Sequence, residues 1–300
     1  MEKQNVRMLT ETVIDFISNL EKDFGVSVSR KGKMIIINNI KGGVGKSAIA
    51  KTLARFLELC NFRVLLIDAD SSGNSSSLFV PEENQDESNK FSNIYEGKTV
   101  RPYSVSENLD VLVGSNELWN VETLLSIKSA NVKLFRSWIF KNNIRDFYDF
   151  IIVDTHNGKG QLNKSIYYAT NDDLVLGVSE PSIDSYGGLI KLQDYLEEIK
   201  NEYTDEETGY CPLKYNFGFI ANKVPNVGKT SKEFMSVATN DNGYIGAIQD
   251  RNIFDDAAAL RKTIFDLTEE SYYNRLDMNF KPFFLHTLEV LKSIVDQAVV

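Results

Sequence analysis

The sequence predicts a single α/β domain with one doubly wound, mostly parallel β-sheet flanked by helices. The first observation behind this prediction is an apolar run at residues 34–38, which leads into a glycine-rich turn. The second is that residues 47–60 carry apolar side chains at helical spacing and precede another apolar run at 64–67. Strand, turn, helix and strand in this order form a βαβ unit, which implies a parallel sheet. The third is that short apolar runs alternate with helical segments along the rest of the chain.

Residues 6–22 precede the βαβ unit and are expected to form an amphipathic helix, because apolar side chains recur at three- and four-residue spacing. We therefore divide the chain into an N-terminal helical extension, residues 1–33, and a main domain, residues 34–300. Two interpretations of the helix stay open: it packs on the main domain, or it is an arm that packs on a partner subunit. It is too short to be an independent DNA-binding domain.

The remaining elements follow from the same patterns. Four further apolar runs are expected to be buried strands, namely residues 110–113, 150–153, 174–178 and 217–221. Helical spacing appears at residues 189–199 and at 282–299. Residues 81–92 are polar and acidic, which predicts a surface loop.

Charge and composition exclude several classes of protein. Lys and Arg number 33 against 42 Asp and Glu, a net charge of −9, so any DNA contact must use a local patch. Cys60 and Cys211 form no C-x-x-C pair, which argues against a zinc site and a disulfide scaffold. No apolar run approaches the roughly 20 residues that span a bilayer, and the N-terminus leads into no apolar signal-peptide core. These features predict a soluble, cytoplasmic protein.

The most specific motif is the segment KGGVGKS at residues 41–47, between the first strand and the first helix of the βαβ unit. Glycines let the backbone turn tightly, with its amides pointing at an anion, and the following helix adds free N–H groups. Lys46 is expected to reach the β- and γ-phosphates, and Ser47 to offer its hydroxyl to Mg²⁺. The predicted ATP-binding residues here are Gly42, Gly43, Val44, Gly45, Lys46, Ser47 and Ala48.

A dinucleotide site is the alternative interpretation of this motif. Residues 43–48 also fit the G-x-G-x-x-A fingerprint, and Asp68 stands at a suitable distance to hold a ribose. That fingerprint is loose, and it leaves the Lys46-Ser47 pair unexplained. The loop also departs from the common phosphate loop, because Ile40 stands where that loop has its first glycine.

Acidic residues follow two of the apolar strands. Asp68 and Asp70 end the strand at residues 64–67, and Asp154 ends the strand at 150–153. The carboxyl ends of parallel strands face the phosphate loop, so these acids can approach Mg²⁺ and the attacking water. We predict Ser47, Asp68 and Asp154 as metal residues. For Asp70 the alternative is that it caps a turn.

These motifs together resemble the ParA/MinD family of ATPases, over about residues 34 to 265. That family has a deviant Walker A motif with an extra lysine at its start, which Lys41 matches. The resemblance implies an ATP-dependent sandwich dimer in which Lys41 reaches the partner's phosphates during hydrolysis. Residues 68–74 resemble the family's D-x-D-P-Q-G-N signature, with two serines in place of Pro-Gln, and the match implies that Asp70 orients the attacking water. Lys41, Lys46 and Asp70 are thus the predicted catalytic residues.

Two segments carry weaker parts of the resemblance. The family continues from Asp-Thr with two prolines, whereas this chain has His156, Asn157 and Gly158, which puts the behaviour of this switch loop in question. His156 is interpreted as a γ-phosphate sensor or as an ordinary loop histidine. The resemblance implies an adenine contact for Asn222, and a turn asparagine before Pro225 is the alternative.

Within the family, DNA partitioning is the branch that remains, and it rests more on the resemblance than on the residues, since the lysine run can also be an ordinary solvated loop. The last sixteen residues contain one lysine against two acids, which argues against the basic membrane helix of the MinD branch. Residues 208–232 contain four lysines and no acid, and Lys214, Lys229, Lys232 and Arg251 are the predicted DNA contacts. The resemblance implies ATP and Mg²⁺ as cofactors, an ATP-dependent homodimer, non-specific DNA, a ParB-like partner and a place on the nucleoid. The alternatives are a positioning switch for a protein cargo and a dinucleotide-dependent oxidoreductase.

Overall fold

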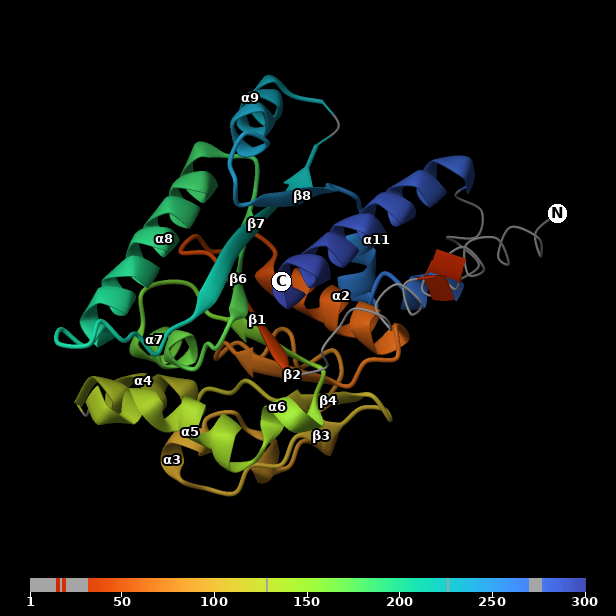
Figure 1. Ribbon diagram of the computed structural model, residues 1–300. Helices are drawn as coiled ribbons and strands as arrows, with labels where there is room; N and C mark the ends of the chain where they lie inside the picture. Colours follow the sequence, from red (N-terminus) through yellow and green to blue (C-terminus); the bar gives the residue numbers. More distant parts are fainter. Residues whose placement is uncertain (1–14, 17, 20–31, 128, 226, 270–276) are drawn as a thin grey trace.

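A computed structural model describes residues 15–16, 18–19, 32–127, 129–225, 227–269 and 277–300 (Figure 1). Among these residues, eight strands form one sheet in the order β3-β4-β2-β5-β1-β6-β7-β8. All neighbouring strands are parallel except β3 and β4. The strands are β1 Lys33–Asn38, β2 Val64–Ala69, β3 Tyr103–Ser104, β4 Leu109–Leu112, β5 Phe150–Thr155, β6 Asp173–Ser179, β7 Tyr215–Val224 and β8 Tyr244–Gln249.

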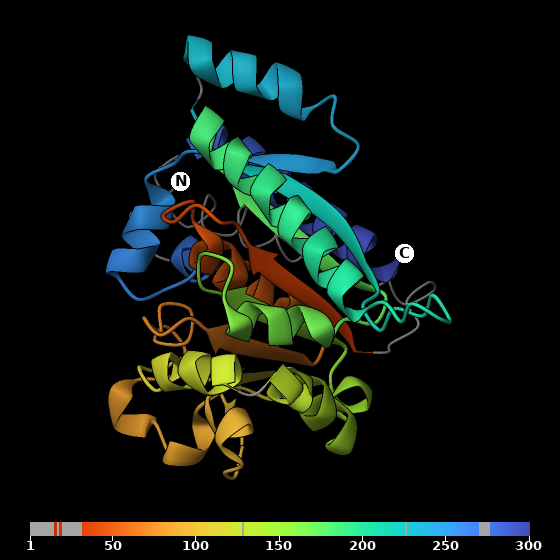
Figure 2. The same cartoon turned by 90° about the vertical axis from the view of Figure 1, so that its left-hand side faces the viewer.

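Helices cover both faces of the sheet. One face is covered by α2 and α11, and the other by α7 and α8, with α4 and α5 beside them (Figures 1 and 2). The helices are α2 Lys46–Leu59, α3 Asn93–Glu96, α4 Leu118–Ile127, α5 Leu134–Lys141, α6 Ile144–Phe147, α7 Gln161–Tyr168, α8 Ile183–Tyr203, α9 Lys229–Ala238, α10 Ile253–Ala259 and α11 Asp277–Val299. In the described part of the chain, no helix combines the length and apolar character needed to cross a bilayer.

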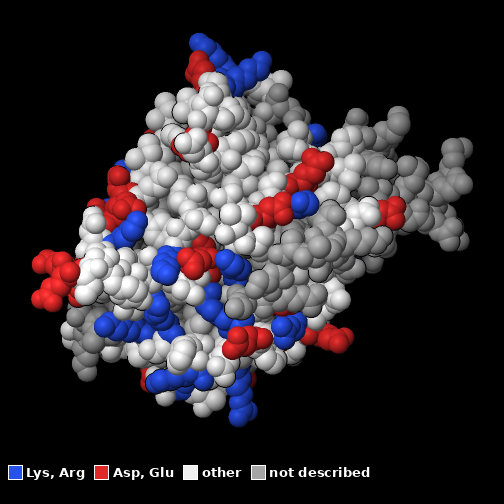
Figure 3. Space-filling view, in the orientation of Figure 1, with Lys and Arg blue, Asp and Glu red and all other residues white. Residues whose placement is uncertain are grey.

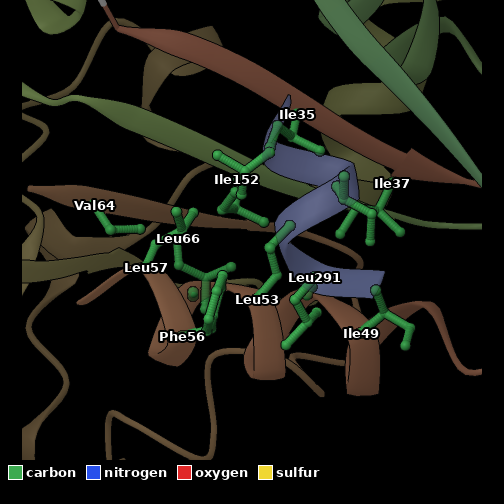
Figure 4. Close-up of a cluster of buried hydrophobic side chains, with 14 of the residues drawn as sticks. Ile35, Ile37, Ile49, Leu53, Phe56, Leu57, Val64, Leu66, Ile152 and Leu291 are labelled. Atoms are coloured by element: carbon green, nitrogen blue, oxygen red, sulfur yellow. The ribbon is translucent and has the colours of Figure 1, made fainter. Parts of the chain in front are cut away.

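The alternation of side chains along β1 explains why the sheet needs both layers. Ile35 and Ile37 belong to the core on the α2 side, whereas Met34 and Ile36 belong to the core on the α8 side. Figure 4 shows the first of these clusters, in which side chains of α2, such as Leu53, pack with strand residues and with Leu291 of α11. Burying one such aliphatic side chain stabilises the fold by about 1.5–3 kcal/mol.

The doubly wound, mostly parallel sheet predicted from the sequence is confirmed. Residues 81–92 are not wholly a surface loop, because Phe91 is buried in the core and stacks edge-on against Phe135. The predicted helix at residues 6–22 lies outside the described residues apart from positions 15–16 and 18–19. Phe16 packs against the core on the α2 side.

Candidate nucleotide-binding site

The phosphate loop connects the end of β1 to the start of α2, at the edge of the sheet where the parallel strands end. Gly43 and Gly45 have φ angles of +79° and +93°, a backbone conformation that residues with a Cβ rarely adopt. Gly45 is also the N-cap of α2, and no side chain caps this helix. The first N–H groups of α2 therefore face the loop without a side-chain partner, which suits an anion.

Lys46 begins α2 and is only 7% exposed. Its ammonium donates a hydrogen bond to Asn157 Oδ1 in the loop after β5. Burial lowers the pKa of Lys46, and the charges of Asp154 and Asp70 oppose that shift. The lysine is thus a buried cation held among acidic residues, as a counter-charge for phosphates requires.

Asp154 and Asp68 are register partners on β5 and β2, so both carboxylates lie at the same level of the sheet. Burial and the charge of Asp68 raise the pKa of Asp154, while the hydroxyls of Ser47 and Ser75 oppose the shift. Both Asp154 oxygens are buried, and among the described residues no hydrogen bond of normal geometry reaches them, although these two hydroxyls lie nearby. A buried, unpartnered carboxylate close to the phosphate-loop serine fits the oxygen ligands that Mg²⁺ prefers.

Asp68 instead holds the loop that follows β2. Its Oδ2 accepts hydrogen bonds from the backbone N–H groups of Ser75 and Ser76 and from the Ser76 hydroxyl, at 2.8–3.0 Å. Its Oδ1 accepts one from the Asp70 N–H at 3.2 Å. These bonds engage both oxygens and make Asp68 an anchor of the loop after β2, and its predicted role as a metal residue stays a prediction.

Asp70 lies half-buried at the start of this loop. Its Oδ1 accepts hydrogen bonds from the backbone N–H and the hydroxyl of Ser72, both at 2.9 Å. The carboxylate therefore stabilises a turn, the alternative that the sequence left open. Its charge nevertheless acts on both Lys46 and His156, which places it beside the phosphate loop.

Lys41 occupies the outer rim of the phosphate loop. Its side chain is 41% exposed, and its ammonium lies 3.8 Å from the carboxylate of Asp184 in the first turn of α8. The backbone N–H of Lys41 donates to Asn39 Oδ1, which fixes the start of the loop. The two lysines therefore have different surroundings, because Lys46 is buried and Lys41 faces outward.

The end of β7 lies against the phosphate loop. Asn222 Nδ2 donates to the carbonyl oxygen of Val44 at 2.9 Å, and a Cβ at Gly45 would collide with this amide. The ammonium of Lys223 donates to the Gly43 carbonyl oxygen at 2.9 Å and pairs with Glu180 at 2.7 Å. Asn222 thus lies beside the phosphate loop with its amide nitrogen bound to the backbone, and its contact with adenine stays a prediction.

The switch loop between β5 and α7 is held by residues that the sequence did not indicate. Asn163 Nδ2 donates to the carbonyl oxygens of His156 and Gly158. Glu122 of α4 accepts hydrogen bonds from the first backbone N–H groups of α7. His156 is half-buried, and burial lowers its pKa. Glu122 comes from a distant segment, so a local motif cannot show its contacts.

The lysine run at residues 208–232 does not form one surface. Lys214 precedes β7, whereas Lys229 and Lys232 lie on α9 beyond its other end, and a strand of this length spans roughly 30 Å. The guanidinium of Arg251 lies over the Phe283 ring and donates to Gln249. The basic atoms at the top of Figure 3 coincide with α9 (Figure 1).

A phosphate-binding loop, an acidic strand end and a doubly wound sheet define a P-loop nucleotide-binding protein. The chain belongs to the AAA domain family, whose model matches residues 32–207, and within it to the ParA/MinD type of P-loop ATPases. This assignment favours the ATPase over the dinucleotide alternative.

Three relatives show the range of similarity. An uncharacterised protein of Methanocaldococcus jannaschii is 30% identical over 204 residues, which are 65% of this chain and 75% of the relative. The probable plasmid-partitioning protein ParA of Thermus thermophilus is 28% identical over 53% of this chain and 48% of its own length. The sporulation initiation inhibitor protein Soj of Bacillus subtilis is 32% identical over 49% of this chain and 58% of its own length. The chain thus spans about half the length of the last two.

Two solved structures share the fold. McdA of Cyanothece has a TM-score of 0.71 at 17% identity and covers 88% of this chain and 99% of its own. A candidate plasmid partition protein of Borrelia burgdorferi, bound to AMPPNP, has a TM-score of 0.69 at 21% identity and covers 89% of this chain and 100% of its own. At these identities the likeness establishes the fold alone.

Proposed function

We propose that the protein is an ATP-driven switch that forms a sandwich dimer on ATP, binds DNA non-specifically and releases it after hydrolysis. The observation that carries this proposal is the pair of lysines in one loop. Lys46 is buried at the start of α2, whereas the side chain of Lys41 is 41% exposed at the rim. A buried lysine serves the phosphates of its own subunit, whereas an exposed one is free to reach those of a second subunit.

ATP and Mg²⁺ are the proposed cofactors. The phosphate-loop amides and Lys46 would bind the phosphates, and Ser47 and Asp154 would hold the metal. Bound Mg²⁺ would supply positive charge that offsets the charge of the phosphates. Asp70, at the start of the next loop, would orient the attacking water. Asn222 stays our proposed adenine contact, because it lies at a strand end beside the loop.

The rim around Lys41 supports the proposed homodimer. Ile183, next to the Asp184 partner of Lys41, is 87% exposed. An apolar side chain at such exposure gains from burial against a second subunit. The pairing of Lys41 with Asp184 is weak, because both side chains are solvated, and it yields easily to a stronger anion such as phosphate.

Lys41→Ala should spare ATP binding by the monomer but weaken dimerisation and hydrolysis by roughly a hundredfold or more, because a charge contact made across the dimer is lost. Light scattering in the presence of ATP measures the mass of the protein and so its dimerisation. Phosphate release measures the rate of hydrolysis, and a fluorescent ATP analogue measures the affinity of the monomer for nucleotide. Lys141→Ala, an exposed lysine on α5, is the matched control. Wild-type dimerisation and turnover in Lys41→Ala would refute the cross-dimer role, and so would a collapse of monomer ATP binding.

DNA binding is proposed for α9. Lys229 and Lys232 are exposed and lie three residues apart on this helix, so they share one face. Lys214 lies at the far end of β7, and the guanidinium of Arg251 lies over the Phe283 ring. Both are therefore less suited to contact DNA together with α9. A dimer would present two such faces, and affinity rises steeply with the number of phosphates contacted. We propose a ParB-like partner and a nucleoid location on the same basis, as family expectations.

Replacing both Lys229 and Lys232 by Ala should weaken DNA binding without changing ATP turnover. Four phosphate contacts per dimer would be lost, so the slope of log affinity against log salt should fall in magnitude by roughly three to four. Fluorescence anisotropy with a labelled duplex, in ATP and at several salt concentrations, measures this slope. Lys214→Ala is the control and should leave it unchanged. An unchanged slope in the double variant would remove α9 from the DNA-binding surface.

A further inference from the structure

The side chain of Asn157, in the switch loop, contacts the phosphate loop. Its Oδ1 accepts the hydrogen bond from the Lys46 ammonium. Its Nδ2 faces the other end of the loop, where a Cβ on Gly42 would lie 2.7 Å from it. The amide therefore spans the phosphate loop from its first glycine to its lysine. Asn157 is itself exposed, so no packing requirement explains this position.

We propose that Asn157 is a built-in competitor of the nucleotide, whose amide and the phosphates exclude each other from the phosphate loop. The inference rests on the proposed function, because it requires that phosphates bind between the loop amides and Lys46. A phosphate at that place needs the Lys46 ammonium and the space above Gly42, and the Asn157 side chain takes both. Nucleotide affinity is then reduced by the fraction of molecules in which Asn157 holds the loop.

The switch loop that carries Asn157 also makes contacts with α8. The carbonyl oxygen of Gly160 accepts a hydrogen bond from the hydroxyl of Tyr195 at 2.9 Å. Lys159 pairs with Glu198 at 3.1 Å and lies over the Tyr195 ring. Both partners are in the C-terminal half of α8, so displacement of the loop by phosphates would act on this part of the helix.

The same helix also reaches the rim of the phosphate loop. Its first turn carries Asp184, which pairs with Lys41, and the carbonyl oxygen of Ser185 accepts a hydrogen bond from Asn39 Nδ2 at 3.2 Å. Displacement of Asn157 is therefore linked, through α8, to the edge at which we propose the second subunit binds. This physical connection is continuous, from Asn157 through the loop to α8 and Lys41.

Isothermal titration with ADP and Mg²⁺ tests the proposal, because ADP binds without hydrolysis. Asn157→Ala removes the competitor and should bind ADP about tenfold more tightly than wild type, the effect of one hydrogen bond to a charged group. Asn157→Asp gives Lys46 a stronger partner and repels phosphate, so it should bind at least about tenfold more weakly. Asn201→Ala, an exposed asparagine of α8, is the control and should match wild type.

The two variants move affinity in opposite directions only if the side chain competes for Lys46. Equal or weaker ADP binding by Asn157→Ala overturns the proposal, and so does unchanged binding by Asn157→Asp. Thermal melting of each variant establishes that it is folded. Failure of the proposed function gives a different result, since wild type and Lys46→Ala would then bind ADP equally weakly.

Discussion

Lys46→Ala is expected to abolish nucleotide binding, with a loss of affinity of at least about a hundredfold, because two charge-assisted hydrogen bonds to phosphate are each worth about 1.5–3 kcal/mol. Lys46 is the buried cation at the start of α2, among the loop amides. The Lys46→Ala variant should keep the fold of the wild-type protein. Alanine is a good helix former, and removal of a cation whose pKa is already lowered by burial relieves a desolvation cost.

Equilibrium binding of a fluorescent ATP analogue measures this loss directly. Lys51→Ala is the matched control, because Lys51 is a half-buried lysine on the same helix that also lies near the charge of Asp154 but is not part of the loop. It should bind the analogue within about threefold of wild type, since it lies beyond the loop. Unchanged affinity in Lys46→Ala would refute the phosphate-loop assignment. Equal losses in both variants would point to a general disturbance of α2.

Asp70→Ala is expected to bind ATP normally and to hydrolyse it about a hundredfold more slowly, which traps the dimer. The reason is the proposed role of Asp70 with the attacking water, for which positioned acids and bases contribute about 10²–10⁴-fold. Lys46 and the loop amides, which bind the nucleotide, remain in place. Light scattering with ATP should therefore show twice the monomer mass, and phosphate release should show slow turnover.

Asp70→Asn separates this role from the turn that Asp70 stabilises. An asparagine oxygen can still accept the two hydrogen bonds from Ser72, so the turn is retained while the charge is lost. Both variants should hydrolyse ATP slowly if the carboxylate acts on water. Normal turnover in Asp70→Asn beside slow turnover in Asp70→Ala would mean that the turn alone matters.

The phosphate loop could be predicted from sequence because its chemistry is local. Glycines, a lysine and a serine at fixed spacing suffice, and the strand before them and the helix after them follow from short-range periodicity. The acidic end of β5 could be predicted from the sequence for the same reason. Residues 150–155 are an apolar run ending in a polar pair, and parallel pairing brings that end to the loop.

Other features depend on contacts between distant segments, and the sequence could not show them. Strand β8 was missed because its half-buried residues include glycine and alanine and form no continuous apolar run. The lysine run was grouped by its closeness in sequence, although its lysines lie before, within and beyond strand β7. Asn157 was visible only as a departure from the family's prolines, and its contact with Lys46 arises when β5 pairs beside β1.

The most direct test of an ATP-switched DNA-binding dimer is a mobility-shift titration of an arbitrary DNA duplex with ATP, with ADP and without nucleotide. We expect a shift with ATP only, and a strongly reduced shift for Lys41→Ala under the same conditions. A shift of equal strength in all three conditions would contradict the nucleotide switch. The absence of any shift with ATP, in a protein shown to dimerise, would contradict the DNA-binding role and favour a protein cargo.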